Sequence, residues 1–302
     1  MIDIMAIRAL GAVSYHGSVI AAAASLGYSP SAVSQQIKKL EKQSGVTLLE
    51  RHGRGVLLTA RGMTLAEHGR RILGDIEELE TSLMADPGQP SGTLRLCAFS
   101  TACRGLIGPL LAELAEDPVQ MTITVVAQDP REAIELVAAG EADLGVVHNW
   151  NSVPLVIPEN IATEDLCRDT ADLLVNRNHR FAALDRVDGA SLADEDWIST
   201  PVGAICHEAL LRIFADLGAV PKIRVYDPDF STHISLVELG VGVALVPRLG
   251  RPALPEAVTV VEVDNPRQVR EVQMVYRKTM AGSPAILHVG RKLRRIASTL
   301  AQ

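Results

Sequence analysis

Residues 18–42 limit what this chain can fold into more than any other stretch of its sequence. The first part carries apolar side chains at i, i+3, i+4 and i+7, namely Val19, Ala22, Ala23 and Leu26. This spacing predicts a short helix with one apolar face. Gly27 suits the left-handed backbone on which helices end, and Ser29-Pro30 is an N-cap followed by proline at the first helical position. The sequence therefore predicts two short helices around a tight turn, the helix-turn-helix arrangement.

The second of these helices has two chemically different faces. One is polar and carries Ser31, Ser34, Gln35 and Lys38, and the other is aliphatic and carries Val33, Ile37 and Leu40. Glutamine pairs bidentately with adenine, serine reaches several base edges, and lysine binds guanine or phosphate. An ordinary amphipathic helix with a solvated face has the same pattern. Within a helix-turn-helix, however, the polar face is expected to enter the major groove of DNA.

A β-hairpin is predicted directly after this unit. Residues 48–59 place two short apolar runs on either side of a glycine-containing turn. Arg51, His52 and Arg54 lie at its tip, where arginines can reach phosphates or the minor groove. A solvated hairpin would show the same residues, but beside a helix-turn-helix this one is typical of the wing of a winged helix.

Residues 8–62 resemble the N-terminal domain of LysR-type transcriptional regulators. The matching elements occur in order: Gly17-Ser18, Ser31-Ala-Val-Ser34, Ile37 with Leu40-Glu41, Gly45-Val46, Leu49-Glu-Arg51, Arg54-Gly55, and Leu58-Thr59 followed by Gly62. Two positions depart from the family pattern, because Pro30 stands where glutamine is usual and Leu49 where phenylalanine is usual. The DNA contacts expected from the helix faces and this resemblance are Ser18, Ser29, Pro30, Ser31, Ala32, Ser34, Gln35, Lys38, Lys39, Arg51 and Arg54.

The charge distribution agrees with a DNA-reading head on an acidic body. The 302-residue chain has a net charge of −7. Residues 1–65 hold seven basic and three acidic side chains, a net charge of +4, so the remaining residues carry −11. One head neutralises few phosphates, so two heads are expected to bind together.

A long helix is predicted to pair the heads. Apolar residues and one glycine recur at alternating steps of four and three at Leu65, Gly69, Ile72, Ile76, Leu79 and Leu83. This heptad-like seam predicts a partner helix, either from a second copy or from the chain's own body. In LysR-type regulators the corresponding helix dimerises, which implies a dimer interface at Leu65, Ile72, Ile76, Leu79 and Leu83. Residues 87–92, with two prolines and two glycines, are expected to form a hinge.

From residue 93 onward strands alternate with helices, which predicts an α/β fold with a mostly parallel sheet. Strands are expected at 93–99, 121–126, 142–147, 170–175, 198–200, 223–225, 243–246 and 269–276, and helices at 104–115, 131–139, 207–217, 232–239 and 284–300. Glu132–Val147 and Leu239–Pro247 make this half similar to the effector-binding domain of the same family, which has the two-lobed fold of periplasmic solute-binding proteins.

The resemblance implies four parts along the chain. They are a winged helix-turn-helix DNA-binding domain (1–60), a linker dimerisation helix (61–86), the hinge (87–92) and an effector-binding domain (93–302). In that last domain, lobe one is expected to comprise 93–165 and 268–302, and lobe two 166–267.

In such a fold the ligand lies between the lobes, at the carboxyl ends of strands and the N-termini of helices. The expected effector-binding residues are Ser100, Thr101, Arg104, His148 and Asn149 in lobe one, and Thr200, Val202, Gly203, Ser231, Thr232 and Pro247 in lobe two. Hydroxyls and amides at the start of a helix bind carboxylates well, so Ser100 and Thr101 indicate a small organic anion. Ser100 is also expected to cap its own helix.

No catalytic or metal-binding set is found in the sequence, so neither an enzyme nor a cofactor is expected. His207-Glu208 begins like a zinc-protease helix, but the second histidine would fall at Leu211. Cys206 lies near the start of a lobe-two helix, whose dipole can lower a thiol pKa. Peroxide-sensing members of the family hold a reactive cysteine in about this place. The resolving cysteine expected nine residues later would be at Ala215.

The chain is thus expected to be a LysR-type transcription factor that binds promoter DNA sequence-specifically as a dimer or tetramer under control of a small-molecule effector. Its expected partners are double-stranded promoter DNA, the effector, further copies of the chain and RNA polymerase. The lack of a membrane-spanning stretch or a leader predicts a cytoplasmic location without a membrane partner. A redox-sensing regulator that uses Cys206, a solute-binding receptor and a non-specific architectural DNA binder are the alternatives.

Overall fold

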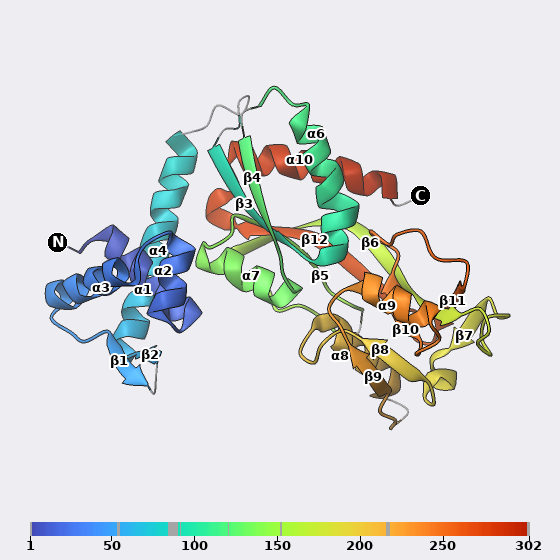
Figure 1. The fold of residues 1–302 in the computed structure, drawn as a ribbon. Helices are drawn as coiled ribbons and strands as arrows, with labels where there is room; N and C mark the ends of the chain where they lie inside the picture. Colours follow the sequence, from blue (N-terminus) through green and yellow to red (C-terminus); the bar gives the residue numbers. More distant parts are fainter. Residues whose placement is uncertain are drawn as a thin grey trace.

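A computed structural model of the chain describes residues 2–52, 55–83, 90, 92–119, 121–151, 153–215 and 218–300. It has an N-terminal head, a long helix beside it, and a larger α/β domain (Figure 1). No helix among these residues has the length and apolar character needed to cross a membrane.

The head is the predicted winged helix-turn-helix. Its elements are α1 (Ile4–His16), α2 (Val19–Leu26), α3 (Pro30–Ser44), β1 (Leu49–His52) and β2 (Gly55–Leu58). Gly27 ends α2 at φ 69°, and the Ser29 side chain accepts a hydrogen bond from the backbone N–H of Ala32. The aliphatic face of α3 is buried as predicted, and it packs on α1 and α2. β1 and β2 pair antiparallel.

The apolar seam of the linker helix α4 (Ala60–Leu83) has different surroundings at its two ends. Leu65 packs against the head core, and a Cβ on Gly69 would lie 2.4 Å from Ile7 Cγ2, so this end of α4 faces its own head. Farther along, Ile72, Leu79 and Leu83 are 45%, 58% and 78% exposed. The predicted end of the helix at residues 84–86 and most of the hinge, 87–89 and 91, lie outside the described residues.

The larger domain contains a mixed sheet. The strand order is β4-β3-β5-β12-β6-β11-β7, β10 also pairs with β6, and β8 pairs separately with β9. The strands are β3 (Gly92–Ala98), β4 (Met121–Ala127), β5 (Leu144–His148), β6 (Ile161–Asn176), β7 (Arg186–Asp188), β8 (Asp196–Ser199), β9 (Lys222–Tyr226), β10 (Ala244–Pro247), β11 (Val258–Asp264) and β12 (Val269–Arg277).

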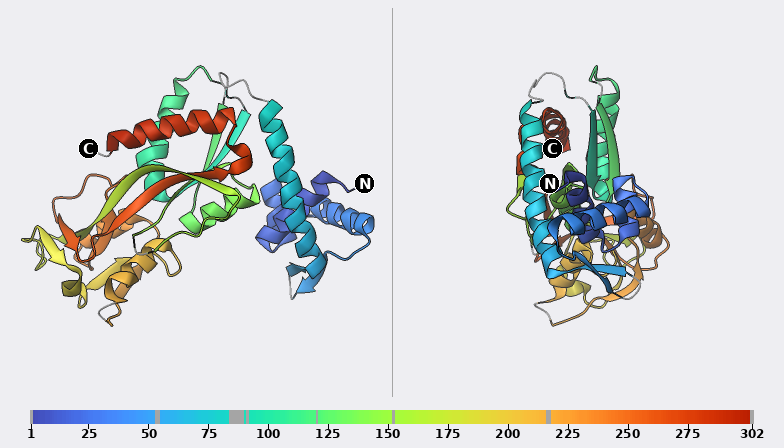
Figure 2. Two further views of the ribbon diagram at one scale, coloured as in Figure 1. Left: turned by 180° about the vertical axis from the view of Figure 1, so that it is seen from behind. Right: turned by 90° about the vertical axis from the view of Figure 1, so that its left-hand side faces the viewer.

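The helices of this domain cover both faces of the sheet (Figure 2). They are α5 (Ser100–Ala102), the π-helical turn η1 (Cys103–Ile107), α6 (Gly108–Ala115), α7 (Pro130–Ala139), the 3-10 turns η2 (Gly189–Leu192) and η3 (Lys278–Met280), α8 (Ile205–Ala215), α9 (Phe230–Glu238) and α10 (Pro284–Leu300). In lobe one, α6 and α10 pack on one face and α7 on the other. Separate apolar cores lie under α8 and α9 in lobe two.

The prediction of a mostly parallel sheet was wrong. The pairs β3–β4, β3–β5, β7–β11 and β8–β9 are parallel, but β12 pairs antiparallel with β5 and β6, and β6 does so with β10 and β11. Only the end of β6 was predicted, and β7 and β11 were missed. The first half of β6 reads Ile-Ala-Thr-Glu-Asp-Leu-Cys-Arg-Asp, and so many charges obscure an apolar alternation. Side chains of β12 pair with several of them: Arg270 lies 2.8 Å from Asp169, and Glu271 lies 3.3 Å from Arg168. Gln273 Nε2 also donates a hydrogen bond to Asp165 Oδ1 at 2.7 Å.

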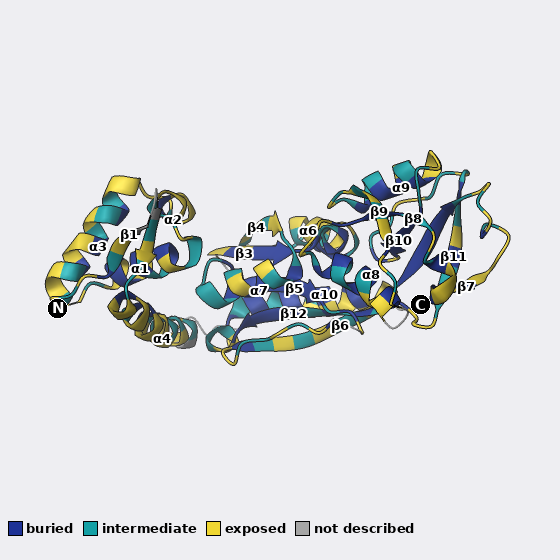
Figure 3. Cartoon of the chain, turned by 90° about the horizontal axis from the view of Figure 1, so that it is seen from below, coloured by how far each residue is buried: buried dark blue, intermediate teal, exposed yellow. Residues whose placement is uncertain are grey.

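Burial follows this architecture (Figure 3). The central strands of the sheet are buried, whereas much of α3 and α4 is exposed. The head therefore presents α3 to solvent while the sheet holds the structural core of the larger domain.

Candidate DNA-binding and effector sites

The polar face of α3 lies on the surface of the head. Ser31, Gln35 and Lys38 are exposed, whereas Ala32 and Ser34 are partly buried. The Ser34 hydroxyl donates to the carbonyl of Pro30 at 2.8 Å, and the hydroxyls of Ser29 and Ser31 lie 2.9 Å apart. These serines are engaged within the helix start, so the longer Gln35 and Lys38 side chains are the ones best placed to reach a partner.

Two of the expected DNA contacts have structural partners within the head. Lys39 Nζ lies 2.7 Å from Asp3 Oδ2, and this hydrogen bond holds the pKa of Asp3 below its usual value. Lys39 thereby ties α3 to the start of α1. The Ser18 hydroxyl caps α2 by accepting from the N–H groups of Ile20 and Ala21. At the wing, Arg54 and the Arg51 side chain lie outside the described residues.

In lobe one, Thr101 turns inward. It is buried, and its hydroxyl accepts a hydrogen bond from Arg270 Nη2 at 2.8 Å. Ser100 is partly exposed and begins α5, but it does not cap that helix as predicted. The cap position is Phe99, which has no side-chain hydroxyl to receive the N–H groups.

Arg104 and Asn149 make contacts that organise the domain. Arg104 Nε donates to the Gly250 carbonyl at 2.9 Å and Nη1 lies 3.4 Å from Asp229 Oδ1, so this arginine bridges the two lobes. The Asn149 amide oxygen accepts from the backbone N–H of Glu271 at 3.0 Å. Both side chains were expected to face a ligand, and both are instead occupied by protein groups.

His148 is buried between aromatic rings. Its ring centroid lies 4.5 Å from that of Phe99, and its Nε2 lies 3.9 Å from Cys206 Sγ. Burial and the positive charge of Arg270 lower the pKa of His148 well below its usual value. The imidazole is therefore neutral at physiological pH and does not supply charge to the site.

The lobe-two candidates separate into buried and exposed groups. Thr200 and Pro247 are buried, Ser231 and Thr232 are partly buried, and Val202 and Gly203 are exposed. Thr200 borders a small cavity of about 20 Å³, which is also lined by Ile198, Ser199, Cys206, Leu210, Phe230, His233 and Leu245. Among the described residues the Thr200 hydroxyl has no hydrogen-bond partner. Thr200 and Cys206 thus line the same cavity, and Cys206 also contacts His148, whereas Val202 and Gly203 are exposed and do not line the cavity.

Arg270 is the central residue that sequence reasoning missed. Its fully buried side chain lies 2.8 Å from Asp169 Oδ2, and its guanidinium carbon lies 4.8 Å from the Phe99 ring and 5.7 Å from the Trp150 ring. Nη1 has no hydrogen-bond partner within the described part of the chain. The sequence did contain a signal for its burial, because Arg270 alternates along β12 with the buried residues Val272, Met274 and Tyr276.

Cys206 lies near the start of α8, but burial has the larger influence on its thiol. Burial raises the pKa of its thiol to about 11, an effect larger than the attraction of Arg270 for the thiolate. Any lowering of this pKa by the helix dipole is therefore outweighed by burial, because the sulfur is packed among apolar side chains of both lobes.

We expect iodoacetamide to modify Cys206 slowly at pH 8, where a thiol of this pKa is only about one thousandth thiolate. The rate followed by mass spectrometry should rise roughly tenfold per pH unit up to pH 9.5. In the urea-unfolded protein Cys206 should react rapidly, and its alkylation rate should level off near pH 9. Fast alkylation of the folded protein at pH 7, or its oxidation by micromolar peroxide, would instead favour the redox-sensing alternative.

Comparison with known proteins agrees with this two-part architecture. Residues 4–63 match the model of the bacterial regulatory helix-turn-helix protein, lysR family, and residues 87–297 match that of the LysR substrate binding domain. The transcriptional regulator ShiR of Corynebacterium glutamicum is 30% identical over 228 residues, covering 74% of this chain and 75% of that protein. The regulator ClcR of Pseudomonas putida is 28% identical over 238 residues, covering 78% and 79%.

Solved structures show the same fold. A full-length OxyR from Pseudomonas aeruginosa matches with a TM-score of 0.74 at 19% identity, over 97% of this chain and 98% of that one. Full-length CbnR in complex with its target DNA matches with a TM-score of 0.54 at 23% identity, over 98% and 99%.

Proposed function

This chain belongs to the LysR family of transcriptional regulators, and on that premise we propose that it recognises a specific promoter sequence through α3 and responds to a small organic anion bound between its lobes. The observation that carries the proposal is the exposed polar face of α3, whose aliphatic back is buried in the head. Such a helix can enter the major groove without unfolding the head.

The exposed half of α4 supports pairing of two chains. Ile72, Leu79 and Leu83 form an apolar strip along this half of the helix, and a second copy would cover it. Two linked heads neutralise more phosphates than one, and their spacing on DNA sets the distance between half-sites. We propose a dimer or tetramer that acts in the cytoplasm, where promoter DNA and RNA polymerase are found.

Buried hydrogen-bond donors at the junction of the lobes support the proposal that the effector is an anion. Arg270 Nη1 and the Thr200 hydroxyl are buried, and each lacks a hydrogen-bond partner among the described residues. A buried donor without a partner costs free energy, and an anion that shifts the lobes can satisfy such groups. The helix-turn-helix head argues against the receptor alternative, because a solute receptor has no use for a DNA-reading helix.

Replacing Gln35 with alanine should weaken binding to the cognate promoter by about 1–3 kcal/mol and relax base preference at one position of each half-site. The reason is the loss of a bidentate contact to a base edge. Fluorescence anisotropy with cognate and single-base-substituted duplexes at fixed salt measures both effects. Equal loss on cognate and random DNA would contradict a base-reading role for Gln35.

Arg54→Ala serves as the contrasting variant. An arginine that binds phosphate adds affinity for any sequence, so its loss should weaken cognate and random DNA alike and flatten the salt dependence. The wild type should prefer its promoter over random DNA by at least about a thousandfold. Absence of that preference would favour an architectural DNA binder.

A further inference from the structure

Helix α7 has one end on lobe two and the other on the linker helix. At its N-terminus, Asp129 caps α7 by accepting from the N–H of Arg131 at 3.1 Å, and its second oxygen accepts from the N–H of Ile205 on α8 at 3.3 Å. Arg131 also forms two 2.6 Å hydrogen bonds with the Glu208 carboxylate and donates to the Gly203 carbonyl at 3.1 Å. One carboxylate and one guanidinium thus join the start of α7 to the start of α8 across the lobe boundary.

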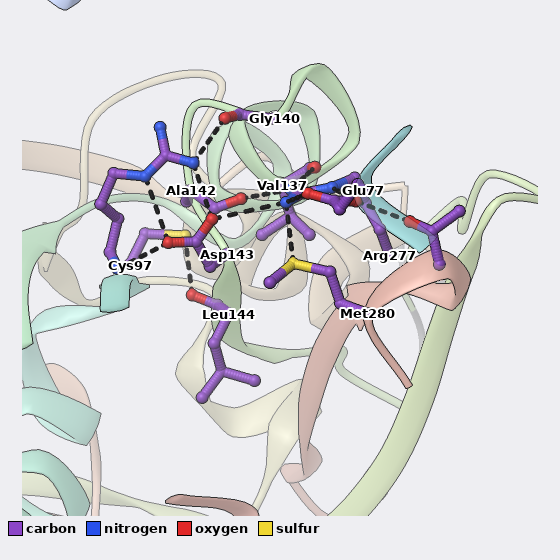
Figure 4. A network of polar contacts seen from close by, with 11 residues as sticks. Glu77, Cys97, Val137, Gly140, Ala142, Asp143, Leu144, Arg277 and Met280 are labelled. Carbon is purple, nitrogen blue, oxygen red and sulfur yellow. Dashed lines mark hydrogen bonds and ion pairs between the residues drawn. The ribbon is translucent and has the colours of Figure 1, made fainter. Parts of the chain in front are cut away.

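Arg277 closes the opposite end of α7 (Figure 4). Its Nη1 donates to the carbonyls of Val137 at 2.7 Å and Ala142 at 2.5 Å, and its Nη2 lies 3.4 Å from Asp143 Oδ1. The last carbonyls of a helix lack intrahelical partners and carry the negative end of its dipole, so a guanidinium is well placed there. Arg277 is 9% exposed, so its position depends on that of α7.

The same guanidinium holds the linker helix. Arg277 Nε and Nη2 lie 2.9 and 2.6 Å from the two carboxylate oxygens of Glu77 on α4, and the Thr279 hydroxyl donates to Glu77 at 2.6 Å. Figure 4 shows Arg277 between Glu77 and the end of α7. A bidentate pair of this kind constrains direction as well as distance.

We propose that α7 is the mechanical connection through which a change in lobe closure repositions the linker helix and, with it, the DNA-reading head. Its ten residues span about 15 Å, and its buried face, with Ala133, Ile134 and Val137, packs on the sheet so that it moves as a rigid body. α1 of the head also contacts α7. Rotation of lobe two pulls on Arg131 through Glu208, and Arg277 passes the displacement to Glu77. This inference rests on the proposed function, in which a ligand between the lobes changes their closure.

Hydrogen exchange of the full-length protein without DNA tests this connection. Glu208→Gln breaks the charge pair at the lobe-two end of α7 and should speed amide exchange in residues 72–83 of α4 about threefold or more. Glu77→Gln should produce the same acceleration directly. In the double variant the Glu208→Gln effect on α4 should disappear, because the two contacts lie on one path.

Two matched variants provide the controls. Glu78→Gln removes an exposed carboxylate next to Glu77, and Arg186→Gln removes a lobe-two ion pair with Glu262 and Asp264 that does not cross the lobe boundary. Neither should change exchange in residues 72–83. Unchanged α4 exchange in Glu208→Gln, equal acceleration by Arg186→Gln, or additive effects in the double variant would each overturn the inference. Promoter binding is measured separately. If the wild type binds its promoter but Glu208→Gln leaves α4 exchange unchanged, only the role of α7 is rejected. If the wild type does not bind promoter DNA at all, the proposed function is rejected.

Discussion

Arg270→Leu is expected to destabilise the effector-binding domain by about 3 kcal/mol, the lower end of the cost of breaking a buried ion pair. The substitution leaves the carboxylate of Asp169, which is 6% exposed, without its partner, and it removes the donor to Thr101. Loss of Nη1, which has no hydrogen-bond partner among the residues that the structure describes, offsets part of this cost, because a buried unsatisfied donor is itself unfavourable. Urea unfolding followed by the fluorescence of Trp150 and Trp197 measures the change.

Arg168→Leu is the matched control for this prediction. Arg168 lies next to Asp169 on β6 and pairs with Glu271, but its side chain is 79% exposed. An exposed pair contributes less than about 1 kcal/mol, so this variant should unfold close to the wild type. In the Arg270→Leu background, Asp169→Asn should regain part of the lost stability by removing the uncompensated charge. Equal changes in the free energy of unfolding for Arg270→Leu and Arg168→Leu would show that the buried ion pair stabilises the domain no more than the exposed one.

Gly62→Ala is expected to destabilise the head by about 3 kcal/mol and to reduce promoter binding accordingly. A Cβ at this position in the first turn of α4 would lie 2.2 Å from the carbonyl oxygen of Leu48. That carbonyl cannot move away easily, since it accepts from the N–H of Thr59 at 2.9 Å while the N–H of Leu48 donates to Glu41 at 2.8 Å. The collision therefore involves backbone that is hydrogen-bonded on both sides. Thermal unfolding and DNA-binding anisotropy test the two effects.

Gly74→Ala on the same helix should have the opposite effect on stability. Among the described residues its Cβ would meet only Thr279 Cγ2, at 3.5 Å, an ordinary van der Waals contact. Alanine is the better helix former by about 1 kcal/mol, so this variant should be slightly more stable than the wild type. Destabilisation by both substitutions to a similar extent would contradict the close approach of Leu48 as the reason for glycine at position 62.

Local signals in the sequence were enough to predict the helix-turn-helix and the hairpin of the head, although they gave no prediction for α1. Gly27, Ser29 and Pro30 act within a few residues of their own positions, and the helical repeat of Val33, Ile37 and Leu40 requires a single buried side. For the same reason the strands and helices of lobe one, apart from the first half of β6, were predicted close to their observed bounds. Caps, turns and periodic apolar faces are short-range properties, so a single sequence contains all the information that they need.

The sites depend on partners that are far apart along the chain. Arg270 donates to Thr101 across 169 positions, and Arg277 binds Glu77 across 200. The sequence showed polar residues at these places but did not indicate that Thr101 faces an arginine, that Lys39 is held by Asp3, or that Gly69 faces Ile7. Each of these outcomes depends on which surfaces meet when the elements pack. A charged side chain is buried only where folding brings a compensating group to it, and that pairing exists only in three dimensions.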